Sequence, residues 1–489
     1  MIITILDCYT DEASGLGVPP YLGTYPRYLY GYLKKQYPDA TIYYLTIDDL
    51  RLWKKHNGKQ LNPKKSQKTN IGTYNLTFNS ENTLTILEKS TELYINLGVH
   101  VPGKYLSATP GTLKEVIPMI CNLKCKKILS GPATIGTQLF GGKFAEKINL
   151  DLFDKIDSMN IPFKEIKEFS ILGAEIIKQI PDIRMIEIET GRGCNVGRCS
   201  FCTEPLKSKV MYRDNKDILE EIKTFYNLGA RYFRLGKQTC FYSLPDPITL
   251  LKDIRGYCKD IKVLHIDNVN PVFTITKRGK EITKAIVEHC TSGNIAAFGV
   301  ESFDQKVTKA NTLNCSAPIA YKAVKTINEF GRERGDNGMP KFLPGINIIF
   351  GLIDESKDTH KANIDCLSKF LEEDLLLRRI NIRQVAILPG TRLEKEAGNK
   401  FIKKNKSNYW KWRDDIRHNI DLPMLKKVIP KDTILKEVYM EIYEGDTTFG
   451  RQFGTYPIVV GVKGRLPLKQ FYDVKIISHN LRSVEGEII

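Results

Sequence analysis

The stretch of sequence that decides the fold is IEIETGRGCNVGRCSFCTEP, residues 186–205. Within it, Cys194, Cys199 and Cys202 lie inside nine consecutive residues. The mostly apolar run at 185–188 predicts a buried strand, and the glycines that follow predict a loop. We therefore expect the cysteines on a loop at the C-terminal end of a strand, where barrels and open α/β sheets place their active sites.

Three clustered thiolates indicate a metal centre with an open position. They leave one iron of a four-iron cluster without a protein ligand, whereas sites with four cysteines are closed and serve structure or electron transfer. A structural zinc site that lacks its fourth ligand and a set of unrelated buried cysteines are the two alternatives. The seven histidines form no HxxxH or HExxH pattern, so the sequence does not predict a separate catalytic zinc.

The cysteine loop resembles that of the radical S-adenosylmethionine (SAM) superfamily. The usual spacing there is C-x3-C-x2-C with an aromatic residue before the last cysteine, here Phe201, whereas this chain has C-x4-C-x2-C. The resemblance implies that Cys194, Cys199 and Cys202 hold a 4Fe-4S cluster whose open iron binds SAM. It also implies that an electron from an external donor cleaves SAM to methionine and a 5′-deoxyadenosyl radical, which abstracts hydrogen from an inert C–H bond.

Strands and helices are expected to alternate over residues 181–425. The predicted strands are 185–188, 232–235, 263–266, 295–300, 346–350 and 380–387, and the predicted helices are 215–228, 249–258, 281–290, 317–334 and 357–371. Right-handed crossovers between parallel strands predict an open (β/α)6 partial barrel, similar to a TIM barrel.

Short motifs at the predicted strand ends extend the resemblance to the superfamily. Gly299-Val-Glu-Ser302, Gly351-Leu-Ile-Asp-Glu355 and Leu388-Pro-Gly-Thr391 match the ends of its fourth, fifth and sixth strands. Gly236-Lys-Gln238 stands where a Gly-Gly-Glu motif commonly holds the amino group of SAM, although Gln238 lacks the charge. The resemblance implies cofactor contacts from Gly236, Gln238, Glu301, Ser302, Gly351 and Glu355. It requires no general base, and we assign no catalytic side chain.

Residues 1–180 are predicted to form an α/β domain. Strands expected at 2–6, 41–45, 93–97 and 127–129 predict a parallel sheet. The domain resembles the Rossmann-like modules that precede many radical SAM barrels, including cobalamin-binding ones. Asp7 is followed by Cys8 and Tyr9 rather than by the Asp-x-His-x-x-Gly cobalamin loop, so only cobalamin without a histidine ligand remains an alternative. A second cluster on Cys8, Cys121 and Cys125, as in methylthiotransferases, is the other alternative.

Composition indicates which kind of partner and which cellular compartment to expect. The net charge is +17, from 73 Lys and Arg against 56 Asp and Glu, which favours a polyanionic partner; a generally lysine-rich proteome is the alternative. Eleven cysteines, three of them in a metal-like loop, are typical of a reducing compartment. The first residues predict no signal peptide, and no apolar run reaches the roughly 18 residues of a membrane span. We therefore expect a cytoplasmic protein.

Two basic segments are candidates for RNA contact. The stretch 52–70 is rich in lysine, including Lys54 and Lys55, and predicts either a phosphate-contacting arm or a solvated loop. Residues 426–489 predict a small β barrel, which resembles the TRAM-type RNA-binding domain of tRNA methylthiotransferases. In it the turn 450–457, with Arg451 and Gln452, is expected to contact RNA. A cap over the open side of the barrel is the alternative.

These observations predict a radical SAM enzyme, a transferase or oxidoreductase, that functionalises a C–H bond in a structured RNA, with tRNA favoured. A radical SAM enzyme that acts on a small molecule, a lipid or a protein is the first alternative. An RNA-binding protein with a purely structural cluster is the second. No oligomeric state is predicted.

Overall fold

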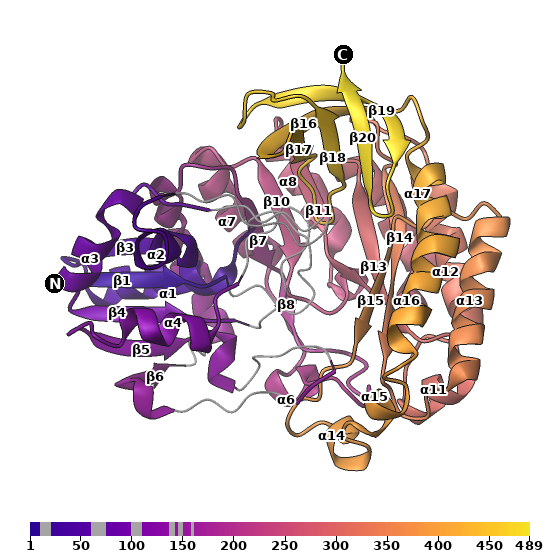
Figure 1. Ribbon diagram of the computed structural model, residues 1–489, viewed down its shortest axis with the longest axis horizontal. Coiled ribbons are helices and arrows are strands. Elements are labelled where there is room, and N and C mark those ends of the chain that lie inside the picture. The colour runs from indigo at the N-terminus through magenta and orange to yellow at the C-terminus, as the bar shows by residue number, and fades with distance from the viewer. Residues whose placement is uncertain (10–20, 60–74, 99–109, 136–141, 145–149, 158–160) are drawn as a thin grey trace. The chain divides into compact units, whose positions relative to one another are not determined.

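The computed structural model describes residues 1–9, 21–59, 75–98, 110–135, 142–144, 150–157 and 161–489 (Figure 1). The chain divides into two compact units: Met1–Phe140, Ala145–Ile188 and Lys216–Phe233 form the first, and Gly141–Phe144, Glu189–Asn215 and Arg234–Ile489 the second. This division passes through strands β7 (Met185–Glu189) and β10 (Tyr232–Gly236), whereas the predicted domains are 1–180, 181–425 and 426–489. Within the described ranges, no helix has the length and apolarity needed to cross a membrane.

A five-stranded parallel sheet forms the centre of the first unit, as predicted. Its order is β3 (Thr41–Thr46), β1 (Ile2–Asp7), β4 (Glu92–Asn96), β5 (Lys126–Ser130) and β6 (Lys155–Asp157). In chain order this is 2-1-3-4-5, the order of flavodoxin-like doubly wound folds. Ile3, Ile5 and Leu6 are fully buried, which is typical of a parallel strand covered on both faces. The helices of this unit are α1 (Thr24–Gln36), α2 (Ile47–Lys54), α3 (Thr83–Lys89), α4 (Leu113–Ile120), α5 (Ile166–Gly173) and α7 (Asn215–Asn227).

Helix α1 is held by two close contacts that require glycine and by a buried ion pair. A Cβ on Gly31 would lie 2.1 Å from the Phe169 carbonyl oxygen, and one on Gly173 would lie 2.0 Å from that of Arg27, so α1 and α5 touch backbone to backbone. The Arg27 guanidinium pairs with Glu221 of α7 at 2.5 Å, with both side chains fully buried. Removing the Glu221 charge would leave the Arg27 guanidinium buried without this counterion.

All six predicted barrel strands are present. They are β7, β10, β11 (Val263–Ile266), β13 (Asn294–Glu301), β14 (Phe342–Phe350) and β15 (Arg379–Gln384). One sheet has the order β11-β10-β7-β2, where β2 is Tyr21–Leu22, and the other has the order β12-β13-β14-β15. Strand β12 (Asn268–Val269) follows β11 after Asp267 alone, so the six strands follow one another in chain order as a partial barrel. The pairs of β13 with β12 and β14, and of β14 with β15, are parallel.

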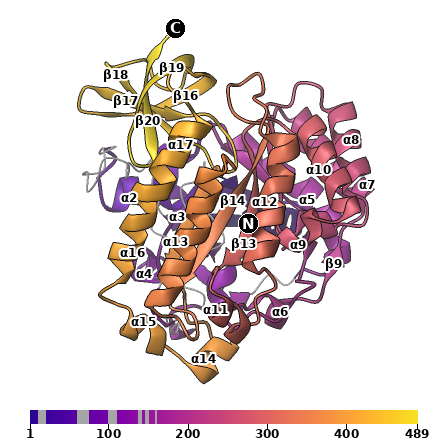
Figure 2. The same ribbon diagram turned by 90° about the vertical axis from the view of Figure 1, so that its right-hand side faces the viewer.

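Helices cover the outside of the strands in the second unit (Figure 2). They are α8 (Pro247–Tyr257), α9 (Pro271–Thr274), α10 (Lys277–His289), α11 (Gln305–Ala310), α12 (Ala317–Gly331) and α13 (Lys357–Glu372), followed by α14 (Arg392–Glu396), α15 (Lys400–Lys404), α16 (Tyr409–Ile416), the π-helical turn Arg417–Asp421 and α17 (Leu422–Val428). The segment 142–144 pairs with the chain beyond β15: the Gly142 amide donates to the Val385 carbonyl, and the Ile387 amide donates to that of Lys143. It covers part of an edge that an open sheet would expose.

The C-terminal strands form a closed barrel, as predicted. Its order is β16 (Ile434–Glu444), β17 (Thr447–Arg451), β18 (Val459–Lys463), β20 (Ser483–Ile488) and β19 (Phe471–His479). Val438, Met440, Val460, Val474 and Val484 are fully buried and fill its interior. Closure removes the free strand edges that so short a β segment would otherwise present.

The segment 452–458, which joins β17 to β18, inserts among side chains of the partial barrel. The Thr455 amide donates to Nδ1 of His265 on β11 at 3.1 Å, and the Tyr456 hydroxyl donates to Asp267 at 3.3 Å. The Arg378 guanidinium donates to the Tyr456 carbonyl, and Arg379 lies over the Tyr456 ring at 4.1 Å. The segment 452–458 therefore packs against side chains of the partial barrel, as the alternative of a cap over the barrel implies.

His265 gives this packing a pH dependence. Burial lowers the pKa of its imidazole from 6.5 to about 4. As pH falls, this imidazole takes up a proton near pH 6.5 in the unfolded chain but only near pH 4 in the folded chain. The free energy of unfolding therefore decreases as pH drops through that window. We expect a loss of about 3 kcal/mol in the free energy of unfolding at the lower end. Urea unfolding midpoints of wild type and His265→Gln between pH 7 and pH 4 measure it, with His418→Gln at an exposed position as the control. Parallel curves for wild type and His265→Gln would contradict this assignment.

Candidate active site

The cysteine loop leaves the barrel at the end of β7 and returns through a small hairpin. Strand β8 (Gly191–Arg192) pairs antiparallel with β9 (Met211–Tyr212) and closes the base of the loop. Gly193 has φ +78°, and a Cβ there would lie 2.5 Å from the Lys209 carbonyl oxygen, so the base requires glycine. The Gly193 amide donates to Glu204, and its carbonyl accepts from the Thr239 hydroxyl. The loop thus starts at the C-terminal end of a barrel strand, as predicted.

The three cysteines are free and partly buried. Two of the sulfurs accept backbone amides: Gly197 donates to Cys194 Sγ at 3.5 Å, and Glu204 donates to Cys202 Sγ at 3.4 Å. Such bonds stabilise thiolates and tune iron–sulfur clusters. Burial raises the pKa of Cys199 to about 12, helped by the nearby Cys202, Glu301 and Cys194. The thiol is therefore protonated when no metal is bound, and it would release its proton to solvent on binding one.

The donor set fits an iron–sulfur cluster with one open position. Three thiolates, two of which receive amide bonds, stand on one glycine-bounded loop. Among the residues that the structure describes, however, no three His, Cys, Asp or Glu side chains converge closely enough to share a metal ion. The fit is thus one of donor type, number and place in the fold.

Ser200, between the second and third cysteines, anchors the loop to the rest of the barrel. It is 1% exposed, and its hydroxyl donates to the side-chain oxygen of Asn311 at 2.6 Å. Asn311, just beyond α11, is fully buried and also bonds the backbone of Ile353 in both directions. One amide side chain therefore ties the cysteine loop to the loop after β14. Neither residue was a predicted site residue, because a single Ser and a single Asn form no motif.

Glu301, the last residue of β13, combines a strained backbone conformation with a buried carboxyl oxygen that has no hydrogen-bond partner among the described residues. Its φ is +66°, rare for a residue with a side chain, and it follows a register shift in the pairing with β14. Its Oε2 is buried without a hydrogen-bond partner among the described residues, and burial raises the pKa of the carboxyl to about 7. Strain and an unsatisfied carboxyl beside Cys199 indicate a functional residue. Its neighbour Ser302 is buried and accepts the Asp304 amide at the start of α11.

Glu355 organises the loop after β14. Its carboxylate accepts the Gly351 amide at 2.6 Å and the Asn405 side-chain amide at 2.9 Å, and only 1% of the residue is exposed. Burial raises the pKa of this carboxyl to about 7. Each oxygen thus accepts one bond from within the loop, which gives Glu355 a positioning role, and its cofactor contact stays a prediction. Gly351, with φ +95°, is enclosed by Ile402 and Val385.

Gly236 and Gln238 tie β10 to the chain after β7. The Thr190 amide donates to the Gly236 carbonyl, and the Thr190 hydroxyl donates to Gln238 Oε1 at 3.1 Å. Gln238 is 1% exposed, and its amide nitrogen donates to the Leu235 carbonyl. The oxygen expected to hold the SAM amino group therefore accepts a bond from within the protein.

The residues predicted to bind RNA are arranged differently from expectation. Arg451 is fully buried and pairs with Glu441 at 2.8 Å, so no phosphate reaches it, and its predicted RNA contact is corrected. The Gln452 side chain donates to the carbonyls of Asn337 and Lys436. Lys54 is exposed at the end of α2, and Lys55 pairs with Glu115. The later part of the 52–70 stretch lies outside the described residues.

The cysteines considered for a second cluster lie at three separate places in the first unit. Cys8 is fully buried after β1, Cys121 is exposed at the end of α4, and Cys125 is buried before β5. They form no metal-binding group in the described part of the chain.

Comparison with known proteins places these features in context. No protein-family model matches the chain. The chain is similar to the uncharacterized protein MJ0274 of Methanocaldococcus jannaschii, with 39% identity over 99% of this chain and 93% of that protein. A region that makes up 34% of this chain is 30% identical to MJ0865 of the same organism, a protein predicted to be a methylthiotransferase, and covers 35% of it.

Among solved structures, the chain is similar to TsrM from Kitasatospora setae, a radical S-adenosylmethionine methyltransferase solved with cobalamin and a 4Fe-4S cluster bound. The TM-score is 0.50 at 10% identity, over 83% of this chain and 75% of that one. At this identity the likeness shows the fold alone.

The enclosure of Gly351 yields a stability prediction. An added Cβ would lie 2.6 Å from Ile402 and 3.1 Å from Val385, in a backbone conformation that favours glycine. We expect Gly351→Ala to lower stability by about 2–3 kcal/mol, and Ile402→Ala in the same chain to relieve part of the extra loss. Gly256→Ala in α8, where nothing lies within 4 Å, should be neutral or slightly stabilising. Thermal unfolding midpoints of the four proteins measure these effects. Equal midpoints for Gly351→Ala and wild type would contradict the close packing around Gly351.

Proposed function

We propose that this chain, which belongs to the radical SAM superfamily and to the family of MJ0274, functionalises a C–H bond in a structured RNA, with tRNA favoured. The observation that carries the proposal is the three-cysteine loop at the C-terminal end of β7 in a partial barrel of parallel strands. Active sites of such barrels lie at that end of the strands.

In this proposal Cys194, Cys199 and Cys202 hold a 4Fe-4S cluster. When bound, the cluster supplies the electron that cleaves SAM and so generates the radical that abstracts hydrogen from the substrate. The protein contributes placement and exclusion of water. Asn311 and Ser200 fix the loop, Glu355 fixes the backbone at Gly351, and Glu301 offers a carboxyl that can hold or release a proton near neutral pH beside Cys199.

One observation supports an RNA substrate, and a second supports the class of chemistry. The net charge of +17 favours a polyanionic partner, because neutralised phosphates release their counterions. The partial match to a protein predicted to be a methylthiotransferase points to the same class of chemistry. Methylthiolation and methylation are both within reach of such a site, and an external electron donor completes the system.

Cobalamin in the first unit is a second candidate cofactor, suggested by TsrM and by one feature of the sheet. The side chains of Asn96 and Ser130, at the C-terminal ends of β4 and β5, are fully buried, and polar atoms of both lack partners among the described residues. This edge is where doubly wound sheets bind ligands. The described residues there include no histidine, and Cys8 is buried, so we derive no step through cobalamin.

The cluster assignment predicts a metal count and a product. Anaerobically reconstituted wild type should hold about four irons and four sulfides per chain and, once reduced, should release 5′-deoxyadenosine from SAM. Changing any of Cys194, Cys199 or Cys202 to Ala should abolish both, because three thiolates are the whole donor set. Cys121→Ala, an exposed cysteine outside the loop, is the matched control and should keep both. A full cluster in the triple Ala variant, or a filled wild type that never yields 5′-deoxyadenosine, would sink the assignment.

The RNA substrate predicts salt-dependent and selective binding. Affinity for total tRNA in a filter-binding series should fall steeply as salt rises, with a slope of roughly 0.7–0.9 per phosphate contact. Heparin, run in parallel, controls for generic charge and should bind more weakly. Equal affinity for the two polyanions would move the small-molecule alternative ahead, and no tRNA binding at low salt would remove RNA from the proposal.

A further inference from the structure

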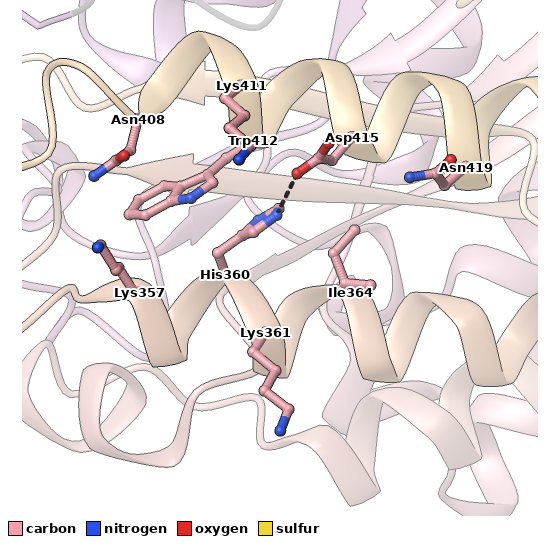
Figure 3. A pocket seen from close by; sticks show the side chains of 9 residues that line it. All are labelled: Lys357, His360, Lys361, Ile364, Asn408, Lys411, Trp412, Asp415 and Asn419. Carbon is pink, nitrogen blue, oxygen red and sulfur yellow. Dashed lines mark hydrogen bonds and ion pairs between the residues drawn. The ribbon is translucent and has the colours of Figure 1, made fainter.

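A groove lies between two helices on the outside of the partial barrel, and the candidate active site does not use it. It has a volume of about 510 Å³. Residues of α13 line one side, and residues of α16 and the following π-helical turn line the other (Figure 3). Its lining residues are Lys357, His360, Lys361, Ile364, Asn408, Lys411, Trp412, Asp415 and Asn419. We call it the α13/α16 groove.

Its floor is fixed. The rings of His360 and Trp412 stack with their centroids 5.3 Å apart and an angle of 12° between their planes. Nε2 of His360 lies 3.1 Å from the Asp415 carboxylate (Figure 3). The Trp412 ring packs against that of Phe350 on β14, with the ring centroids 5.6 Å apart. A floor anchored in the barrel core keeps its shape, so a ligand would meet a preformed surface.

Its rim is positively charged, with three lysines against one aspartate in the lining. Lys357, Lys361 and Lys411 are exposed, and none has an ion-pair partner among the described residues. The only acid in the lining is Asp415, whose carboxylate is already bonded to His360. Some exposed lysines of the second unit are neutralised, as Lys341 is by Glu333 and Lys427 by Asp374, whereas the three groove lysines are not.

Further exposed lysines lie in the chain just before α16. Lys403 and Lys404 end α15, Lys406 follows, and all three are exposed. The Asn405 side chain donates to Glu355 at 2.9 Å, next to the start of α13, and so holds this turn against that helix. Like charges gathered without counterions repel one another, and a bound anion relieves that repulsion.

We propose that the α13/α16 groove binds backbone phosphates of the substrate RNA. The lysines meet the phosphates, and the side-chain amides of Asn408 and Asn419 offer donors to phosphate oxygens or ribose hydroxyls. These are contacts that position an RNA and read no base. The inference rests on the proposed function and gives RNA binding the local surface that the buried Arg451 does not provide.

The test compares two triple variants that remove the same charge. Lys357→Gln/Lys361→Gln/Lys411→Gln neutralises the groove. Lys280→Gln/Lys322→Gln/Lys325→Gln neutralises three exposed lysines of α10 and α12 that likewise have no ion-pair partner among the described residues. Filter binding of total tRNA at about 0.1 M salt should show at least a tenfold loss for the groove variant and a much smaller one for the control. The groove variant's salt slope should fall by about three contacts. Iron content and 5′-deoxyadenosine release should equal those of wild type in both variants.

Any other outcome contradicts either the groove assignment or the proposed function. A groove variant that binds tRNA as wild type does, or a control that loses as much, overturns the groove assignment and leaves the proposed function intact. Equal losses for tRNA and heparin show a generic polyanion surface and also overturn it. If wild type binds no tRNA even at low salt, the RNA part of the proposed function is itself wrong. Ultraviolet crosslinking of bound tRNA should mark peptides that contain residues 357–364 or 408–419, and crosslinks confined to other peptides would contradict the assignment.

Discussion

The arrangement of the candidate site depends on one buried amide, that of Asn311. Its oxygen accepts the Ser200 hydroxyl and the Ile353 amide, and its nitrogen donates to the carbonyls of Val307 and Ile353. The cysteine loop, α11 and the loop after β14 therefore meet at one side chain with no exposed surface. A buried polar group with every bond made rigidifies its surroundings, and a missing partner would cost the full desolvation of the remaining ones.

Much of the fold is predictable from sequence because each barrel strand is a short apolar run followed by an amphipathic helix. The parallel sheet at 2–7, 41–46, 92–96 and 126–130 and the closed C-terminal barrel follow from the same periodicity. The segment 452–458 is not predictable in this way, because Gln452 and Gly454 are residues typical of an exposed turn. Its burial comes from long-range contacts with His265, Asp267 and Arg378, which no local pattern records.

The site is predictable where a motif exists and unpredictable where the function of a residue depends on its surroundings. Spacing alone identifies the three cysteines. Glu301 and Glu355 come from similar strand-end motifs, yet one keeps an unpartnered buried oxygen and the other is used by Gly351 and Asn405. The α13/α16 groove joins residues about fifty positions apart on two helices, and only the fold reveals that its lysines lack counterions.

The central claim is that the three-cysteine loop carries a cluster with an iron open to SAM. Electron paramagnetic resonance of the reduced, reconstituted protein, recorded before and after SAM is added, tests it most directly. The account predicts the signal of a reduced 4Fe-4S cluster, and a change in that signal on addition of SAM, because a new ligand reaches the open iron. A cluster signal that SAM leaves unchanged, or no cluster signal in a protein with full iron content, would contradict it.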